Sequence, residues 1–274
     1  KMHVADAGSR NGTWLDGRPL LPGQWTELAD GAILRLGSTL LVYRARLLGP
    51  LSPSPPLAAW EGAGLVGPYG LRQVAAAIDV LSRHPPANVL IEGETGTGKE
   101  LVARAVAAAI GRATPYAAVN VAGVASGVFE SQLFGHVAGA FSDARRASKG
   151  IVANHEGGTV FLDEIGELGL ELQPKLLRLL ENRELLPVGA DAPQKVDVLI
   201  VAATNRALSD MVAGGTFRRD LLARLESATV PLPPVRERIE DVYAIACALA
   251  PQAGVALAPD RCEVEAVERL LLHD

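Results

Sequence analysis

Short apolar runs separated by turn signals fill the first part of the chain. Residues 33–36 and 40–43 are two such runs, and Asn-Gly, Asp-Gly or Pro-Gly pairs punctuate the surrounding sequence at residues 11–12, 16–17, 22–23 and 30–31. Pairs of this kind favour tight turns between antiparallel strands. We therefore predict a small all-β region over residues 1–47.

A proline-rich stretch interrupts this pattern. Its prolines are Pro50, Pro53, Pro55 and Pro56. Because repeated prolines remove backbone donors and favour an extended chain, we assign residues 48–63 to a linker.

Beyond residue 64 the pattern changes to strands that alternate with helices. Strands are predicted over residues 88–91, 116–121, 159–162 and 196–203, and helices over residues 99–110 and 172–181. The last two strands are almost continuously apolar, which is typical of a parallel sheet with helices on both faces. Residues 239–274 read as helices only. We predict an α/β core over residues 64–238, followed by the start of a helical subdomain over residues 239–274.

Composition narrows the class of protein. Hydrophobic residues make up 49% of the chain and charged residues 21%, as in a globular protein with ample core. The net charge of -5 does not indicate a nucleic-acid surface. Cys247 and Cys262 lack metal-like spacing and fit a reducing compartment. No stretch approaches the roughly 20 apolar residues of a membrane span, and the first residues do not resemble a signal peptide. We expect a cytoplasmic protein without a membrane partner.

The first strand of the core leads into a glycine-rich loop that opens a helix. This loop reads Gly93-Glu94-Thr95-Gly96-Thr97-Gly98-Lys99. In such a G-x-x-x-x-G-K loop the backbone N–H groups converge on phosphate oxygens, the helix N-terminus adds its positive dipole end, and the lysine reaches the β and γ phosphates. A glycine-rich structural turn is the alternative, but the flanking strand and helix favour an ATP-binding loop.

Two acidic residues end a later apolar strand. Asp163 is predicted to hold Mg²⁺ through its water shell, and Glu164 to orient and deprotonate the attacking water. Mg²⁺ depends more on Asp163 because Glu100 stands where Ser or Thr usually follows the lysine. Two solvated acids at a strand end are the alternative. Asn205 ends a third strand, where its amide is expected to contact the γ-phosphate or the attacking water. A helix cap or a turn residue is the alternative.

The residues from about 64 to 274 closely resemble the AAA+ ATPases of bacterial enhancer-binding proteins, the activators of sigma-54 RNA polymerase. The resemblance rests on six segments in the same order, at residues 93–104, 133–136, 157–168, 202–206, 217–225 and 232–238. It implies a P-loop AAA+ three-layer αβα sandwich with a parallel sheet, working as a homo-oligomeric ring, hexameric or heptameric. A glutamate directly after the lysine, as at Glu100, is itself typical of this family.

The resemblance also implies roles that spacing does not show. Asn120 matches the switch asparagine that holds the catalytic glutamate until the nucleotide state changes. Arg218 and Arg224 match two arginines presented to the nucleotide of the neighbouring subunit, where a planar guanidinium spreads the charge of the transferring group. The alternative for Asn120 is a strand-end amide that makes local hydrogen bonds. The alternative for Arg218 and Arg224 is that both are solvated surface arginines. The expected nucleotide-binding set consists of Val66, Gly67, Gly93, Glu94, Thr95, Gly96, Thr97, Gly98, Lys99, Glu100 and Leu101.

The segment Gly139-Ala140-Phe141-Ser142-Asp143-Ala144 stands where the family places its sigma-54-contacting loop, normally Gly-Ala-Phe-Thr-Gly-Ala. Ser142 keeps the hydroxyl, whereas Asp143 adds charge and restricts the backbone. Val137 and Ala138 replace residues that are commonly charged. Two interpretations stay open, namely a loop that engages sigma-54 and a loop that has drifted or serves another client.

Residues 6–17 look like the second half of a forkhead-associated (FHA) domain, a β-sandwich that binds phosphothreonine peptides. Ser9, Arg10 and Asn11 precede a turn and are expected to donate hydrogen bonds to a peptide or phosphate; a hairpin turn without a ligand is the alternative. The family's earlier Gly-Arg and Ser-x-x-His segments precede this stretch, so we expect the protein to begin earlier and this piece alone not to bind.

These features together predict an FHA-linked sigma-54 activator that hydrolyses ATP with Mg²⁺ and remodels sigma-54 RNA polymerase. Its FHA domain would bind a phosphothreonine peptide or kinase once intact. The family continues past residue 274 with a sensor arginine and usually a DNA-binding domain, so DNA contact is expected only there. A non-hydrolysing FHA signalling scaffold is the other alternative.

Overall fold

The computed structural model describes residues 1–46, 64–67, 69–123, 126–141, 144–255 and 262–273. The chain forms two compact units. One consists of Lys1–Leu57, Val66–Gln73 and Pro233–Asp274, and the other of Ala58–Leu65 and Val74–Leu232. Among the described residues, no helix has both the length and the apolar character that crossing a membrane requires.

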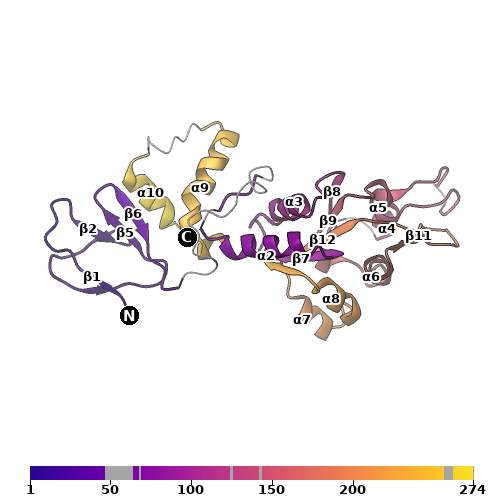
Figure 1. The fold of residues 1–274 in the computed structure, drawn as a ribbon, viewed down its shortest axis with the longest axis horizontal. Helices are drawn as coiled ribbons and strands as arrows, with labels where there is room; N and C mark the ends of the chain where they lie inside the picture. The colour runs from indigo at the N-terminus through magenta and orange to yellow at the C-terminus, as the bar shows by residue number, and fades with distance from the viewer. Residues whose placement is uncertain (47–63, 68, 124–125, 142–143, 256–261, 274) are drawn as a thin grey trace. The chain divides into compact units, whose positions relative to one another are not determined.

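A five-stranded parallel sheet forms the centre of the second unit (Figure 1). Its order is β13-β7-β12-β9-β8. The strands are β7 (Asn88–Glu92), β8 (Tyr116–Asn120), β9 (Thr159–Asp163), β12 (Leu199–Thr204) and β13 (Thr229–Pro231). The central strands β7, β9 and β12 are buried along almost their whole length. Their continuous apolar runs therefore have the expected cause, which is cover on both faces.

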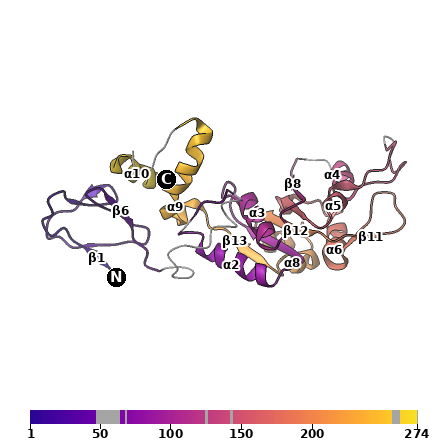
Figure 2. The same ribbon diagram turned by 45° about the horizontal axis from the view of Figure 1, so that its top comes forward.

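Helices cover both faces of this sheet. They are α2 (Arg72–Arg83), α3 (Lys99–Ala109), α4 (Ser126–Phe134), α5 (Gly150–Asn154), α6 (Gln173–Asn182), α7 (Leu208–Ala213) and α8 (Arg219–Leu225). The connection from β7 through α3 runs toward β8, and the later connections run back across the sheet. In Figures 1 and 2, α3 lies on one side of the sheet and α6 and α8 lie on the other, as the right-handed rule for parallel crossovers requires for these two directions.

The main hydrophobic core lies between the sheet and the helices α4, α6 and α8. Phe129 and Phe134 from α4, Leu176 from α6 and Leu225 from α8 pack there against alternate strand residues such as Leu162. On the opposite side of the same strands, α3 presents a buried, small-residue face. The predicted αβα sandwich is confirmed, and the strand ends are thereby fixed at one edge.

One predicted strand starts later than its apolar run suggests. The expected strand over residues 196–203 begins only at Leu199, because the main chain before it serves other partners. The N–H of Val196 donates to the carbonyl of Arg183, and the carbonyl of Asp197 accepts from Gly157. Short strands β10 (Glu184–Leu185) and β11 (Gln194–Lys195) pair antiparallel just before it.

The first unit contains the antiparallel strands expected at the start of the chain. These are β1 (His3–Val4), β2 (Thr13–Leu15), β3 (Arg18–Pro19), β4 (Thr26–Glu27), β5 (Ile33–Leu36) and β6 (Thr39–Val42). A four-stranded sheet has the order β3-β2-β5-β6, and β1 pairs with β4. The same unit contains the helices α9 (Ile239–Leu249) and α10 (Val264–Leu271).

Candidate functional site

The glycine-rich loop connects the carboxyl end of β7 to the N-terminus of α3. Gly98 caps α3 in a left-handed conformation with φ of 96°, and Gly96 also has a positive φ of 81°. A Cβ on Gly93 would come within 3.0 Å of the carbonyl oxygen of Leu232 and 3.2 Å of Thr97 Oγ1. Glycine is therefore favoured by the backbone conformation at Gly96 and Gly98, and by the tight space around Gly93.

Lys99 is folded back onto this loop. Its Nζ donates to the carbonyl oxygens of Gly93 and Glu94 at 3.1 and 3.0 Å, and the residue is 8% exposed. The first turn of α3 has no side-chain cap from Gly98. An ammonium group held beside uncapped N–H groups fits an anionic phosphate ligand.

The two predicted acids lie at the end of β9. Asp163 is the last residue of that strand, and Glu164 adopts a left-handed conformation with φ of 57°, which non-glycine residues seldom take. The N–H of Glu164 donates to Asp163 Oδ1 at 3.0 Å. The backbone therefore turns sharply directly after Asp163, and the roles of the two acids stay predictions.

Asn205 connects the end of β12 to the glycine-rich loop. Its Nδ2 donates to Thr95 Oγ1 at 2.9 Å, and the N–H of Gly93 donates to the carbonyl of Thr204 at 3.1 Å. Three strand ends thus meet at one edge of the sheet. The N-cap of α7 is Ala207, so Asn205 does not cap this helix. Its contact with the γ-phosphate or the attacking water stays a prediction.

Asn120 lies beside the acids by strand register. It is paired with Asp163 across β8 and β9, and the N–H of Val121 donates to the Asp163 carbonyl at 3.0 Å. Its own Oδ1 accepts a 2.7 Å hydrogen bond from the N–H of Ala122. The structure therefore places Asn120 beside Asp163, the residue directly before Glu164, with its side chain bonded locally.

One carboxylate at this edge, that of Glu92, is not among the residues predicted from the sequence. Burial raises the pKa of Glu92, and the nearby Glu226 raises it further. Glu92 ends β7 directly before Gly93, and Glu226 follows α8. An acid immediately before a phosphate loop was the available signal, but its partner is 134 positions away in the sequence.

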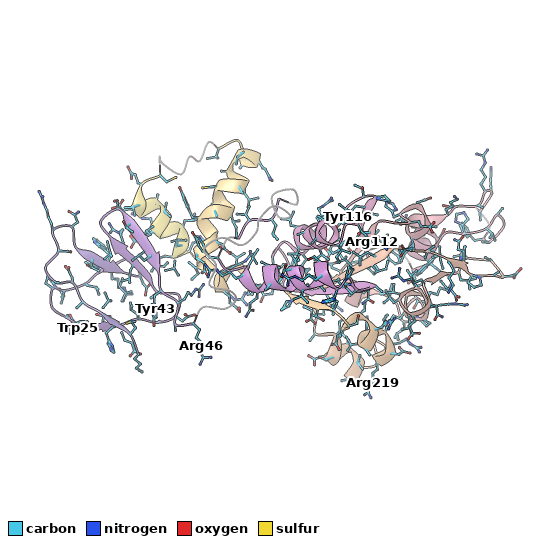
Figure 3. The ribbon with its side chains drawn as sticks, viewed as in Figure 1. Trp25, Tyr43, Arg46, Arg112, Tyr116 and Arg219 are labelled. Atoms are coloured by element: carbon cyan, nitrogen blue, oxygen red, sulfur yellow. The ribbon has the colours of Figure 1, made fainter. Side chains whose placement is uncertain are left out.

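The two candidate trans-acting arginines differ in their surroundings. Arg218 precedes α8 with a side chain 45% exposed, and donates to both carboxylate oxygens of Asp220 at 3.0 and 2.7 Å. These bonds hold the pKa of Asp220 below its usual value. Arg224 is half-buried and donates to the carbonyl of Leu180 at 3.4 Å. Arg219, between them, points away from the ribbon (Figure 3).

The candidate client loop leaves the unit through a narrow neck after α4. His136 and Ser148 exchange two backbone hydrogen bonds of 2.9 Å, and Val137 donates to the carbonyl of Val188 at 3.0 Å. Farther out, Gly139 donates to Ala144 at 2.7 Å. Phe141 is 44% exposed. Ser142 and Asp143 lie outside the described residues.

The remaining predicted residues have simpler surroundings. Glu100 pairs with Arg104 on the surface of α3 at 2.9 Å, one turn away, and Leu101 is half-buried. Val66 and Gly67 belong to the first unit, where a Cβ on Gly67 would come within 2.5 Å of Leu71.

The predicted phosphopeptide residues form an exposed turn in the first unit. Ser9, Arg10 and Asn11 are all exposed. The N–H of Ser9 donates to Asp6 Oδ1 at 2.9 Å, and this bond lowers the pKa of Asp6. Asn11 lies next to Gly37 of the following turn.

The edge of the sheet where β7, β9 and β12 end is called the nucleotide edge. Its carboxylates suit a phosphate-bound magnesium ion. Within the part of the chain that the structure describes, three or more His, Cys, Asp or Glu side chains do not converge on one point. Mg²⁺ keeps several waters and is usually held by one or two carboxylates with substrate phosphates, so Asp163 fits that role.

Two protein-family models match the chain. The Sigma-54 interaction domain matches residues 69–231, and the FHA domain matches residues 1–37. Regulatory protein LuxO of Vibrio cholerae serotype O1 is 47% identical over 192 residues, which cover 69% of this chain and 36% of LuxO. The anaerobic nitric oxide reductase transcription regulator NorR of Escherichia coli O1:K1 / APEC is 45% identical over 249 residues, which cover 90% of this chain and 49% of NorR.

Solved structures show the same likeness. NtrX from Brucella abortus in complex with ADP has a TM-score of 0.62 at 30% identity over 77% of this chain and 51% of NtrX. Its complex with ATP gives 0.60 at 31% identity over 76% and 51%. The chain spans about half or less of the length of the curated relatives described above. Because the family model covers residues 69–231 of 274, the chain belongs to the Sigma-54 interaction domain family, the AAA+ ATPases of sigma-54-dependent transcriptional regulators.

Proposed function

We propose that this chain binds ATP at the edge where β7, β9 and β12 end and hydrolyses it there. The observation that carries the proposal is the convergence of Lys99, Asp163 and Asn205 at that edge, through the glycine-rich loop, the β9 end and the Asn205–Thr95 hydrogen bond. NtrX, which shares this fold, was crystallised with ATP and with ADP.

Each residue has a task that follows from its position. Lys99 would exchange its two backbone carbonyl partners for phosphate oxygens, a stronger pairing of opposite charges. Glu164 would orient the attacking water and accept its proton. Asn205 would contact the γ-phosphate or that water. Asp163 would hold Mg²⁺, which neutralises charge on the phosphates.

The arginines support hydrolysis between subunits. Arg218 is exposed, precedes a helix and already binds a carboxylate in a bidentate manner. A phosphate oxygen pair from a neighbouring nucleotide offers the same geometry, so Arg218 would exchange Asp220 for it. We propose a homo-oligomeric ring, hexameric in the simplest case, in which Arg218 and Arg224 face the next subunit and Asn120 responds to the nucleotide state.

The output and input of this motor extend the proposal. The loop around Phe141 would contact sigma-54, so that hydrolysis remodels its RNA polymerase complex in the cytoplasm. The turn of Ser9, Arg10 and Asn11 would belong to a complete FHA domain that recognises phosphothreonine. We place the FHA region at 1–47, the linker at 48–63, the ATPase core at 64–238 and the lid at 239–274.

Hydrolysis is tested by steady-state ATPase rates of the protein and its Glu164→Gln variant. We expect a loss of at least about a hundredfold for the general base. Glu156→Gln is the matched control, because Glu156 is an exposed acid that precedes the amino end of the same strand. Equal rates for all three proteins would leave no motor and would favour the signalling scaffold.

The client is tested separately by capture. The protein, mixed with ADP and aluminium fluoride, is expected to retain sigma-54 in a stable complex. An ATPase that captures no sigma-54 under these conditions would indicate another client, the alternative motivated by Val137 and Asp143.

A further inference from the structure

The imidazole of His136 contacts three separate parts of the candidate client loop and its base. Its Nδ1 lies 2.7 Å from Ser131 Oγ on α4, and its Nε2 lies 3.0 Å from the carbonyl oxygen of Arg146 on the returning arm. Its ring lies 5.0 Å from the ring of Phe141, at an interplanar angle of 60°. One side chain therefore joins the helix, the returning arm and the aromatic tip.

The hydrogen-bond partners fix the orientation of this ring. The Arg146 carbonyl only accepts, so Nε2 carries the hydrogen. In the neutral ring Nδ1 is then an acceptor, and the hydroxyl of Ser131 donates to it. With both nitrogens bonded, the ring cannot rotate without losing a hydrogen bond. Its tilted orientation relative to the Phe141 ring is therefore held in place.

The backbone around His136 is equally constrained. Gly135 has a φ of 81°, and a Cβ there would come within 2.4 Å of the Ser148 carbonyl oxygen. His136 and Ser148 exchange both backbone hydrogen bonds. The position of the imidazole is thus set by α4 and the neck, and is independent of the exposed tip.

We propose that His136 is a positioning residue that holds Phe141 in the orientation in which the loop meets its client. Tilted aromatic pairs at this separation are favourable beyond simple burial. Phe141 is nevertheless 44% exposed, so the ring contact steadies one side while the other faces solvent. The inference rests on the proposed role of this loop in sigma-54 contact.

A purely structural role for His136 predicts something different. If only the hydrogen bonds to Ser131 and Arg146 matter, a long polar side chain at this position should preserve sigma-54 capture. If the ring contact with Phe141 matters, an aromatic side chain should replace it even without those bonds. His136→Gln and His136→Phe separate the two roles, and His136→Ala removes both.

Three measurements on the same variants test the inference. We expect His136→Ala to keep its ATPase rate within about twofold of the parent and to lose sigma-54 capture by about tenfold, because a ring contact and two hydrogen bonds are removed. Limited trypsin digestion should cleave after Arg145 and Arg146 about fivefold faster, since the returning arm is released. His136→Phe should restore most of the capture, and His136→Gln should not.

Several outcomes would overturn the inference. Capture by His136→Ala at the parental level would show that Phe141 needs no support, and restoration by glutamine alone would reduce His136 to a neck hydrogen bond. If the parent protein itself captures no sigma-54, the proposed client fails. The positioning role is then judged by digestion of the other two variants: slow cleavage in His136→Phe but not in His136→Gln would support it, and slow cleavage in His136→Gln alone would contradict it.

Discussion

The nucleotide edge and the loop around Phe141 belong to the same compact unit but are held in opposite ways. At the edge, Ile91, Leu162 and Ala203 directly precede or lie next to the functional residues and are almost wholly buried. The loop leaves through a neck of a few backbone hydrogen bonds and exposes its aromatic tip. The proposed chemistry thus depends on strand ends backed by a buried core, whereas the proposed partner contact depends on a projection that the described residues hold through a short neck.

This difference predicts that substitutions at the two regions have separable effects. Changes at the edge should stop hydrolysis and with it every later step. Changes in the loop should leave hydrolysis intact and remove only the output.

Replacing Lys99 should have the largest effect. Lys99→Ala removes the ammonium group that we propose to contact the phosphates, so the ATPase rate should fall by about a thousandfold, since charged contacts to a transferring group act in a desolvated site. A fluorescent ATP analogue should also bind more weakly. Lys149→Ala, which removes an exposed lysine, is the control and should match the parent.

Arg218 should be nearly as important, but only through a neighbour. Arg218→Ala should lower the ATPase rate by about a hundredfold or more, whereas Arg219→Ala should stay within twofold of the parent, roughly the effect of an exposed charge. Mixing Arg218→Ala with Glu164→Gln subunits should restore activity, because about one interface in four then contains both intact groups. Activity that stays absent in the mixture would contradict catalysis across subunits.

The Asn205–Thr95 contact should contribute less. Thr95→Val removes the hydroxyl that accepts from Asn205, and we expect kcat to fall by about tenfold with a smaller change in KM, because a neutral hydrogen bond is lost near the reacting phosphate. Asn205→Ala should give a similar fall, and the double variant should add little. Fully additive losses would show that the two residues act independently.

The smallest effect is expected near the opposite edge of the sheet. Arg112 and Arg183 both contact Asp197, and the hydrogen bond from Arg112 lowers the pKa of Asp197 (Figure 3 labels Arg112). A lowered folded pKa stabilises the fold above the unfolded pKa, and this contribution is lost as the pH falls below about 4. Because Asp197 is 52% exposed, Asp197→Asn should cost less than about 1 kcal/mol at pH 7.

Thermal unfolding of this variant at pH 7 and at pH 3 provides the test. The difference from the parent should shrink at the lower pH, and Asp191→Asn, at an exposed acid, serves as the control. A difference that grows at low pH would contradict the assigned sign.

The sequence predicted the parts of the site that depend on local pattern. The glycine-rich loop, the apolar strand before Asp163 and the helix after Lys99 follow from spacing and composition, and they lie where expected. The strand start at Leu199 was not predictable, because the main chain of Asp197 is occupied by Gly157 from a distant segment.

Side-chain pairings across the fold were also beyond the sequence. The contact of Asn205 with Thr95 spans 110 positions of the sequence. Glu226 raises the pKa of Glu92 only because α8 and β7 meet in space. The different surroundings of Arg218 and Arg224, six residues apart, depend on Asp220 and on the carbonyl of Leu180. The roles of these residues stay proposals.

The separation of hydrolysis from client contact is tested most directly by Phe141→Ala. ATPase rate and sigma-54 capture with ADP and aluminium fluoride are measured on the same preparation. We predict an ATPase rate within about twofold of the parent, because Phe141 lies on an exposed projection, and capture reduced by at least about tenfold, because a central aromatic anchor is removed. Hydrolysis that falls together with capture, or capture that persists, would contradict the account.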